Sequence, residues 1–319
     1  MASLSGHDGF RARGIRKPVG GIGVQAGRLY LGVYCGGSRC RARLRDADGR
    51  MIAEAQGPGG NLYVNFDAAL AAVAAQSDAA CAKAGFGAAN RAELALGLGL
   101  AGLSTPAEAK RVEARFADFA SVRAANDAVA GCLGAHGGGD GALVIAGTGS
   151  AAIARVGGRE TLIGGRGFLL GDDGSVARVG AEAIRAALRA CDGVGPASPL
   201  TDEVMRRFGD PLTATQWALT AKPAGYAAFT PLVFERAAAA DPVARGIVEA
   251  AARAIDALIE ATRALGANHV VLVGGMIPAI TPYLAAASRA RLREPQYDDA
   301  DGAILIAGGA LPALEGVAR

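Results

Sequence analysis

Two short glycine-rich turns have the residue types and the placement that phosphate binding requires. Each follows an apolar run, LYLGVY in the first case and ALVIA in the second. Glycine lets the backbone approach a ligand closely, so that successive N–H groups can point at a phosphate. A hairpin without a ligand is the better explanation of one such turn alone, but their recurrence predicts two loops that bracket a polyphosphate in a cleft. These predicted phosphate loops consist of Gly36, Gly37 and Ser38, and of Gly147, Thr148, Gly149 and Ser150.

Neither turn matches a better-known nucleotide motif. The Walker pattern G-x-x-x-x-G-K-[ST] is absent, and neither turn is a G-x-G-x-x-G that opens a helix. A third glycine pair, Gly274 and Gly275, follows the apolar run VVLV and precedes a predicted helix. This pair could let the adenine and ribose of a nucleoside lie against the backbone, or it could be an ordinary turn from strand to helix.

The elements that would position these turns form a repeat. Three short strands precede a helix, a strand and a second helix in residues 28–122, and a similar order returns in the second half of the chain. The halves barely match in sequence, so their common order is best explained by internal duplication. We expect two domains, residues 28–122 and 123–319, the second carrying a helical insertion at about 196–240.

The two ends of the chain differ from these domains. Residues 1–27 are rich in glycine and arginine and lack apolar periodicity, which predicts a flexible extension. The closing segment DGAILIAGGALPAL predicts a final helix, with a short buried strand as the alternative. Such a helix either stays with the second domain or packs back on the first.

Composition excludes several classes of protein. Of the 319 residues, 51% are hydrophobic, 20% are charged and 5% are aromatic, and the formal net charge is +3. These values favour a soluble globular chain without the basic stripe or exposed rings that nucleic-acid binding requires. No apolar stretch reaches the roughly 18 residues of a membrane span. Five cysteines without a C-x-x-C pair indicate a reducing compartment, so we expect a cytoplasmic protein that binds neither nucleic acid nor membrane.

Three longer motifs carry a resemblance to a known family. Val144–Ser150 reads V-I-A-G-T-G-S, Gly164–Ser175 reads G-G-R-G-F-L-L-G-D-D-G-S, and Val271–Gly275 reads V-L-V-G-G. With the shorter segments A-N-D-A and G-L-A-G, residues 29–314 resemble the BadF/BadG-type ATPase family, which includes N-acetylglucosamine and glucosamine kinases. The resemblance implies an α/β fold of two duplicated RNase H-like (actin-like ATPase) domains with an interdomain cleft.

The resemblance also assigns roles to individual residues. The two glycine loops would bind the phosphates of ATP, and Gly274 and Gly275 its adenosine. Asp127 would accept the proton of a sugar hydroxyl that attacks the γ-phosphate, although helix capping is the alternative for Asp127 and Asp172. Asp172 would also contribute to a Mg²⁺ site. Contacts to the sugar would come from Asn61, Gly102, Asp127, Gly165 and Asp172.

The first loop departs from the family pattern. Relatives read D-G-G-G-T, whereas this chain reads Tyr34-Cys35-Gly36-Gly37-Ser38. A phenol therefore replaces the carboxylate that would help to hold hydrated Mg²⁺, and a neutral tyrosine is a poor ligand for this ion. Asp173 also stands where the family usually has glutamate, which shortens its reach by one methylene.

The expected function is ATP-dependent phosphorylation of an amino sugar such as N-acetylglucosamine or glucosamine, with ATP and Mg²⁺ as cofactors. The alternative is a non-catalytic nucleotide- or sugar-binding protein, in which Tyr34 marks the loss of metal-supported turnover. The expected partner is a small sugar, and the resemblance further suggests a homodimer.

Overall fold

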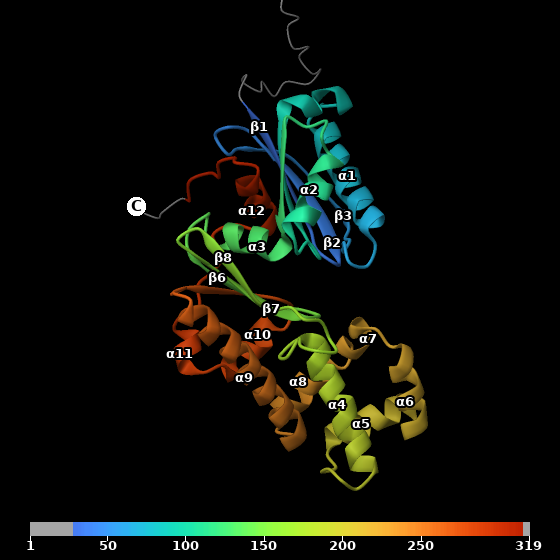
Figure 1. Ribbon diagram of the computed structural model, residues 1–319. Helices are drawn as coiled ribbons and strands as arrows, with labels where there is room; N and C mark the ends of the chain where they lie inside the picture. Colours follow the sequence, from blue (N-terminus) through green and yellow to red (C-terminus); the bar gives the residue numbers. More distant parts are fainter. Residues whose placement is uncertain (1–27, 315–319) are drawn as a thin grey trace, which may run out of the picture.

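Residues 28–314 are described by a computed structural model, in which the chain forms two halves, each built on one β-sheet (Figure 1). The expected flexible extension, residues 1–27, lies outside the described residues. The first half runs from the blue strands to the green helices, and the second half contains the remaining helices and strands except for the last helix.

The sheet of the first half has five strands: β1 (Leu29–Cys35), β2 (Arg39–Arg45), β3 (Met51–Pro58), β4 (Leu94–Leu100) and β5 (Ser121–Asn126). They lie in the order β3-β2-β1-β4-β5, the first three antiparallel and the last two parallel. The segment D-A-D-G, a sequence typical of hairpin turns, joins β2 to β3. Asp46 Oδ1 stabilises this turn by accepting hydrogen bonds from the N–H groups of Asp48 and Arg50. Gly49 supplies the positive φ of 80° that this turn needs.

Two helices, α1 (Phe66–Lys83) and α2 (Pro106–Ala114), cover one face of this sheet, and a short 3-10 helix, η1 (Ala88–Glu93), leads into β4 (Figure 1). Asn65 caps α1 by accepting a hydrogen bond from the Ala68 N–H at 2.9 Å. Thr105 caps α2 together with Glu108, and Pro106 occupies the first turn, a combination typical of helix starts. The apolar core between helices and sheet holds the strands in register.

The sheet of the second half has four strands: β6 (Gly141–Ala146), β7 (Ser150–Val156), β8 (Arg159–Gly164) and β9 (Val270–Val273). They lie in the order β8-β7-β6-β9, with an antiparallel meander followed by one parallel strand. This is the order of the first sheet without its fifth strand, so the predicted repeat of strand order is confirmed. Equivalent strand ends in the two sheets therefore carry the two glycine loops.

Helices make up the rest of the second half. The segment expected to be a helical insertion, about 196–240, contains four of them, and within residues 28–314 no helix is long and apolar enough to cross a membrane. The helices are α4 (Val176–Cys191), α5 (Pro199–Phe208), α6 (Pro211–Thr220), α7 (Pro223–Ala227), α8 (Thr230–Ala238), α9 (Pro242–Ala264), α10 (Ile277–Ile280) and α11 (Ala286–Arg289), with a 3-10 helix η2 (Thr281–Tyr283).

Two further helices, α3 (Asp127–Ala135) and α12 (Asp299–Ile306), pack against each other where the halves meet (Figure 1). Their contact is close, since a Cβ at Gly302 would lie 1.7 Å from the Ala130 carbonyl oxygen. The closing segment is thus helical as far as Ile306, and this helix lies on the first sheet, on the face opposite α1. β5 pairs with β4 as far as Asn126, so the first sheet extends past residue 122, where the sequence placed the domain boundary.

Candidate functional site

A cavity of about 540 Å³ lies where the starts of α3 and α12 meet the ends of β1 and β9. Tyr34 stands near the end of β1, Asp127 begins α3, and Gly274 directly follows β9. The structure therefore brings together the predicted proton acceptor, the residue that departs from the family pattern and one residue of the predicted adenosine turn. Charged and hydroxyl side chains that line the cavity include Tyr34, Arg39, Arg41, Asp127, Asp298 and Asp299.

Asn126 is the N-cap of α3. Asn126 Oδ1 accepts a hydrogen bond from the Ala128 N–H at 2.9 Å, and its Nδ2 donates to the Leu103 carbonyl oxygen at 2.8 Å. The Asp127 Oδ1 accepts a second hydrogen bond from the same Ala128 N–H at 3.0 Å. Burial raises the pKa of Asp127 and the nearby Asp299 raises it further, whereas the Ala128 N–H acts in the opposite direction. A partly buried carboxylate with a raised pKa that lines a cavity is well suited to accept a proton.

Tyr34 lies beside the backbone of the first glycine loop. A Cβ at Gly36 would stand 2.9 Å from the Tyr34 hydroxyl oxygen and 3.1 Å from its Cε1, so the ring covers this part of the loop. Burial raises the pKa of the phenol, and Asp127 and Asp299 raise it further. Tyr34 is therefore a neutral hydroxyl at ordinary pH, and the departure from D-G-G-G-T lies inside the cavity.

The first glycine loop is tied to the segment that follows β3. The Gly36 N–H donates to the Arg39 carbonyl oxygen at 3.0 Å, and the Gly36 carbonyl accepts from the Gly60 N–H at 3.1 Å. Gly37 and Ser38 at the tip are exposed. The loop thus has a fixed base and an accessible tip, but its three residues do not line the cavity beside Tyr34.

The second glycine loop is held by the segment between β8 and α4. The Ser150 N–H donates to Asp172 Oδ1 at 3.2 Å, and the Ser150 hydroxyl donates to the Asp173 carbonyl oxygen at 2.7 Å. Gly274 lies against the start of this loop, because a Cβ there would be 2.0 Å from the Ala146 carbonyl oxygen. The predicted adenosine turn, the second loop and Asp172 are therefore brought together, with Thr148 exposed at the loop tip.

Three glycines of the predicted nucleotide site have space where a side chain would be. No heavy atom lies within 4 Å of a Cβ built at Gly37 or Gly275, and at Gly147 the nearest is the Gly149 oxygen at 4.0 Å. None of the three has a positive φ. Neither crowding by the chain nor backbone conformation requires glycine here, so the open space fits a ligand that approaches the backbone.

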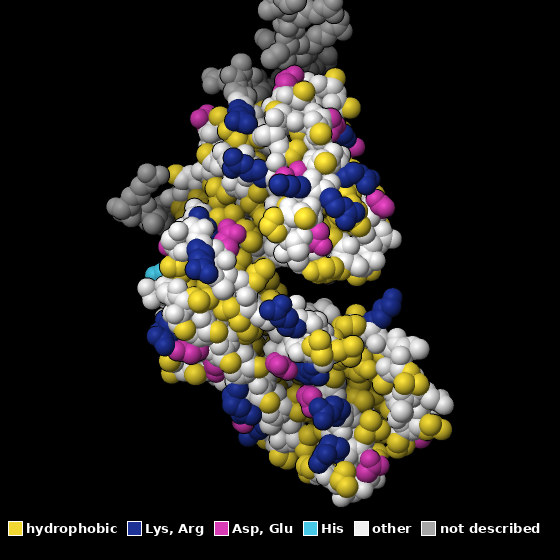
Figure 2. Space-filling view, viewed as in Figure 1, with side chains coloured by type: hydrophobic (Ala, Val, Ile, Leu, Met, Phe, Trp, Pro, Cys, Tyr) yellow, Lys and Arg dark blue, Asp and Glu magenta, His cyan; other side chains and the backbone are white. Residues whose placement is uncertain are grey.

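The residues expected to contact the sugar form two groups. In the first half, Asn61 lies beside Gly102, where a Cβ would be 2.6 Å from the Asn61 Oδ1. In the second half, the Gly165 N–H donates to the Ser150 carbonyl oxygen at 3.1 Å, close to Asp172. The β3–α1 loop, which carries Asn61, and the β8–α4 loop, which carries Gly165 and Asp172, lie on opposite sides of a hollow in the surface (Figures 1 and 2).

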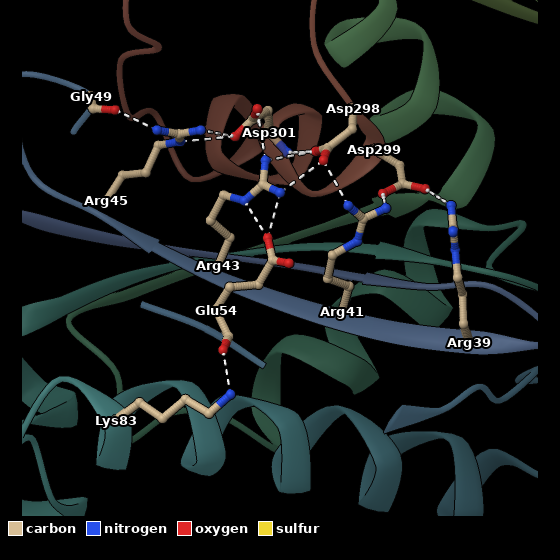
Figure 3. Close-up of polar contacts among 10 residues, drawn as sticks. All are labelled: Arg39, Arg41, Arg43, Arg45, Gly49, Glu54, Lys83, Asp298, Asp299 and Asp301. Carbon is tan, nitrogen blue, oxygen red and sulfur yellow. Dashed lines mark hydrogen bonds and ion pairs between the residues drawn. The ribbon is translucent and has the colours of Figure 1, made fainter. Parts of the chain in front are cut away.

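A network of ion pairs that was not expected from the sequence joins β2 to the start of α12 (Figure 3). Arg41 binds Asp298 at 2.7 Å, and Arg43 and Arg45 each bind Asp301 at 2.8 Å. The signal in the sequence was R-C-R-A-R-L-R, which places four arginines on one face of a strand, together with the acidic run D-D-A-D. Because Arg41 and Asp298 line the cavity, this network fixes one of its walls.

Carboxylates that could hold a metal are sparse. Across the described part of the chain, no group of three or more histidine, cysteine, aspartate or glutamate side chains is arranged to hold a metal ion. So few carboxylates could still bind Mg²⁺, because this ion commonly takes one or two carboxylates from the protein and the rest of its ligands from phosphates and water. Asp127 in the cavity and Asp172 beside the second loop are the carboxylates that could serve.

Known proteins resemble this chain along most of its length. Residues 31–307 match the BadF/BadG/BcrA/BcrD ATPase family. A glucosamine kinase of Vibrio cholerae is 34% identical over 284 residues, which cover 88% of this chain and 95% of that protein. The crystal structure of a candidate N-acetylglucosamine kinase from Chromobacterium violaceum is 35% identical and matches with a TM-score of 0.79, covering 88% of this chain and 99% of that one.

A more distant structure shares the fold alone. It is a candidate N-acetylglucosamine kinase from Porphyromonas gingivalis, 17% identical, with a TM-score of 0.57 over 87% of this chain and 97% of that one. Two sheets with a common strand order define the class of ATPases with duplicated RNase H-like (actin-like ATPase) domains, and the expected fold is confirmed. The chain belongs to the BadF/BadG/BcrA/BcrD ATPase family.

Proposed function

We propose that this protein is an ATP-dependent kinase that phosphorylates a hydroxyl of an amino sugar such as glucosamine or N-acetylglucosamine. The observation that carries the proposal is the cavity in which the Asp127 carboxylate lies beside Gly274 and Tyr34. The relatives in Vibrio cholerae and Chromobacterium violaceum, described as kinases of these two sugars, support the same activity. The alternative of a non-catalytic binding protein is not favoured.

In this mechanism Asp127 acts as the general base. The sugar hydroxyl oxygen forms a bond to the γ-phosphorus, the bond from that phosphorus to the β–γ bridging oxygen breaks, and Asp127 takes the hydroxyl proton. The raised pKa of Asp127 makes it a stronger base than an exposed aspartate. Asn126 supports this role, because it caps α3 and leaves the Asp127 side chain at the cavity wall.

The glycine loops bind the nucleotide in this proposal. Backbone N–H groups of residues 36–38 and 147–150 bind the phosphates of ATP, and the open space at Gly37, Gly147 and Gly275 admits the ligand. Mg²⁺ would neutralise charge on the β- and γ-phosphates, with Asp172 as its protein ligand. Ser150 orients the Asp172 carboxylate through the backbone N–H.

The sugar is bound between the two loops that face the hollow. Asn61 and Gly102 contact it from the first half, and Gly165 and Asp172 contact it from the second. Large apolar side chains are exposed on both loops, which suits surfaces that come together when the halves close on the substrate. These exposed side chains are Tyr63, Val64, Leu169 and Leu170.

A coupled assay of ADP release tests the function. We expect turnover with glucosamine or N-acetylglucosamine in the presence of MgATP, and little with sugars that lack the nitrogen substituent. Absence of sugar-dependent ADP release across glucosamine, N-acetylglucosamine, N-acetylmannosamine and glucose would refute the kinase. Light scattering on the same sample tests whether the protein forms a homodimer. Fractionation of cells that express a reporter-tagged chain tests the cytoplasmic location, which predicts that the chain stays in the soluble fraction.

A further inference from the structure

Four arginines alternate along β2 and face the start of α12 (Figure 3). Their side chains become more exposed toward the first glycine loop. Arg45 is 8% exposed and Arg43 is 9% exposed, whereas Arg41 is 15% exposed and Arg39 is 62% exposed. The row therefore runs from a buried end inside the protein to an accessible end beside the predicted phosphate loop.

The three more buried arginines are held by several partners. Arg45 binds Asp301 at 2.8 Å and donates to the Gly49 carbonyl oxygen at 2.6 Å. Arg43 also binds Asp301, together with Glu54 and Asp298. Each of these three guanidinium groups makes at least two ion pairs or hydrogen bonds, and removing one would break them together, so we regard these arginines as structural.

Arg39 is held differently, by a single carboxylate oxygen. Its Nη2 lies 3.0 Å from Asp299 Oδ2, while Arg41 binds the other oxygen of the same carboxylate at 2.9 Å. If Arg39 moved away, Asp299 would keep Arg41 as its partner. Because exposed ion pairs contribute little to stability, Arg39 can exchange this contact for another anion at small cost.

Arg39 is also in the right place for a phosphate. It directly follows the first glycine loop, and its carbonyl oxygen accepts the hydrogen bond of the Gly36 N–H at 3.0 Å. Its side chain lines the cavity that contains Asp127 and Gly274. A guanidinium group can bind two phosphate oxygens through parallel N–H donors, which makes arginine well suited to a polyphosphate.

We propose that Arg39 binds the polyphosphate of the nucleotide, exchanging its ion pair with Asp299 for one with the phosphates. This rests on the proposed function, which it deepens by naming a cationic contact for the ATP phosphates. Arg39 supplies positive charge on the side of the cavity where Tyr34, a neutral phenol, offers a metal ion no carboxylate. Arg41 stays on Asp299 throughout and keeps the start of α12 in place.

The test compares binding of ATP, ADP and adenosine to wild type and Arg39→Gln by isothermal titration calorimetry, with sugar-kinase turnover measured in parallel. The substitution removes the charge while keeping hydrogen-bonding capacity. We expect ATP affinity to fall about 10- to 100-fold, the range for loss of a charged hydrogen bond. Adenosine affinity and the melting temperature should stay unchanged. Arg39→Lys, which keeps a cation without the fork, should recover part of the loss.

Arg50→Gln is the matched control. Arg50 is 60% exposed and pairs with Asp46 at 3.2 Å, but it lies beyond the opposite end of β2, so its loss should leave ATP binding unchanged. Wild-type ATP affinity in Arg39→Gln, or an equal loss for ATP and adenosine, overturns the assignment. If wild type binds ATP but phosphorylates no sugar, the kinase fails and the binding data still decide the role of Arg39. A wild type that binds no ATP overturns both.

Discussion

The Asp172 carboxylate holds the second glycine loop through the backbone N–H of Ser150, which donates to Asp172 Oδ1 over 3.2 Å. Asp172 has a φ of 58°, in the left-handed region that few side chains other than aspartate and asparagine adopt readily. A Cβ at Gly149 would be 2.8 Å from Asp172 Oδ2, so the carboxylate lies directly against the loop. Loop support and metal binding are therefore separate roles that one side chain could fill.

Substitution of Asp172 separates these two roles. Asp172→Asn keeps an oxygen acceptor for Ser150 and tolerates the left-handed backbone, but it lacks the charge that Mg²⁺ prefers. We expect the Mg²⁺ concentration for half-maximal turnover to rise about 10-fold or more, with ATP binding in the absence of metal unchanged. Asp172→Ala, which loses the acceptor as well, should weaken both. If Asp172→Asn has the same Mg²⁺ dependence as wild type, Asp172 does not bind the metal and only supports the second glycine loop.

Asp127→Asn tests the general base. The amide keeps the shape of the side chain and cannot take a proton, so sugar phosphorylation should fall about 10²- to 10⁴-fold. ATP binding, measured by calorimetry, should change little because the amide keeps the shape of the side chain and the groups proposed to bind the phosphates, the glycine loops and Arg39, are unchanged. Turnover close to wild type in this variant would show that another group accepts the proton.

The raised pKa of Asp127 also predicts a pH dependence. The unprotonated carboxylate is the active form, so kcat/KM should fall with decreasing pH at a value above the ordinary 3.8 of aspartate. Since the folded pKa exceeds the unfolded one, ionisation of Asp127 lowers the free energy of unfolding as pH rises through this interval. Asp127→Asn should therefore gain stability relative to wild type at neutral pH and not at pH 3. If the difference in stability between Asp127→Asn and wild type were the same at both pH values, the raised pKa of Asp127 would be contradicted.

The glycines with open space predict loss of binding without loss of stability. Alanine at Gly147 or Gly275 meets no protein atom closer than 4.0 Å, so the melting temperature should stay nearly constant while the methyl group blocks the phosphates or adenosine. Gly246→Ala is a control in α9, again with no atom within 4 Å. It should stabilise the helix by about 0.5–1 kcal/mol and leave ATP binding intact. Unaltered ATP affinity in both loop variants would remove these glycines from the site.

Much of the fold could be predicted from the sequence because its signals are local. The D-A-D-G turn, the Thr105-Pro106 helix start and the apolar strands each depend on neighbouring residues, and the structure has all three. The repeat of strand order then follows from counting elements. The placement of α12 on the first sheet depends on contacts between distant residues, such as Gly302 with Ala130, and the sequence left it open.

The site was less predictable for the same reason. The arginines of β2 read as an ordinary polar strand face until their partners at residues 298–301 are placed opposite them. Comparison with D-G-G-G-T places Cys35 in the first loop, yet it is a buried strand residue directly opposite Cys40. The backbone at Cys35 is that of a regular strand and needs no glycine, so Cys35→Gly would only remove packing from the core.

Tyr34→Asp asks whether a carboxylate in the first loop improves catalysis. Tyr34 lies near Asp127 and Asp299, whose charges already raise the pKa of its phenol. An aspartate there would add a third negative charge, which a divalent cation would stabilise, so turnover should become more steeply dependent on Mg²⁺. Better placement of the metal against the phosphates should raise kcat, since a misplacement of about 1 Å can cost roughly 100-fold.

Tyr34→Phe is the matched control, because it keeps the ring over Gly36 and removes only the hydroxyl. If the Tyr34 hydroxyl has no role of its own and the loop simply lacks a carboxylate, Tyr34→Phe should behave like wild type in kcat and in Mg²⁺ dependence. A large loss in Tyr34→Phe, with no gain in Tyr34→Asp, would mean that the Tyr34 hydroxyl itself contacts the phosphates or the sugar. The wild-type cavity would then be a working alternative to the D-G-G-G-T loop, in which a neutral donor at position 34 and the cation of Arg39 replace a metal-binding carboxylate.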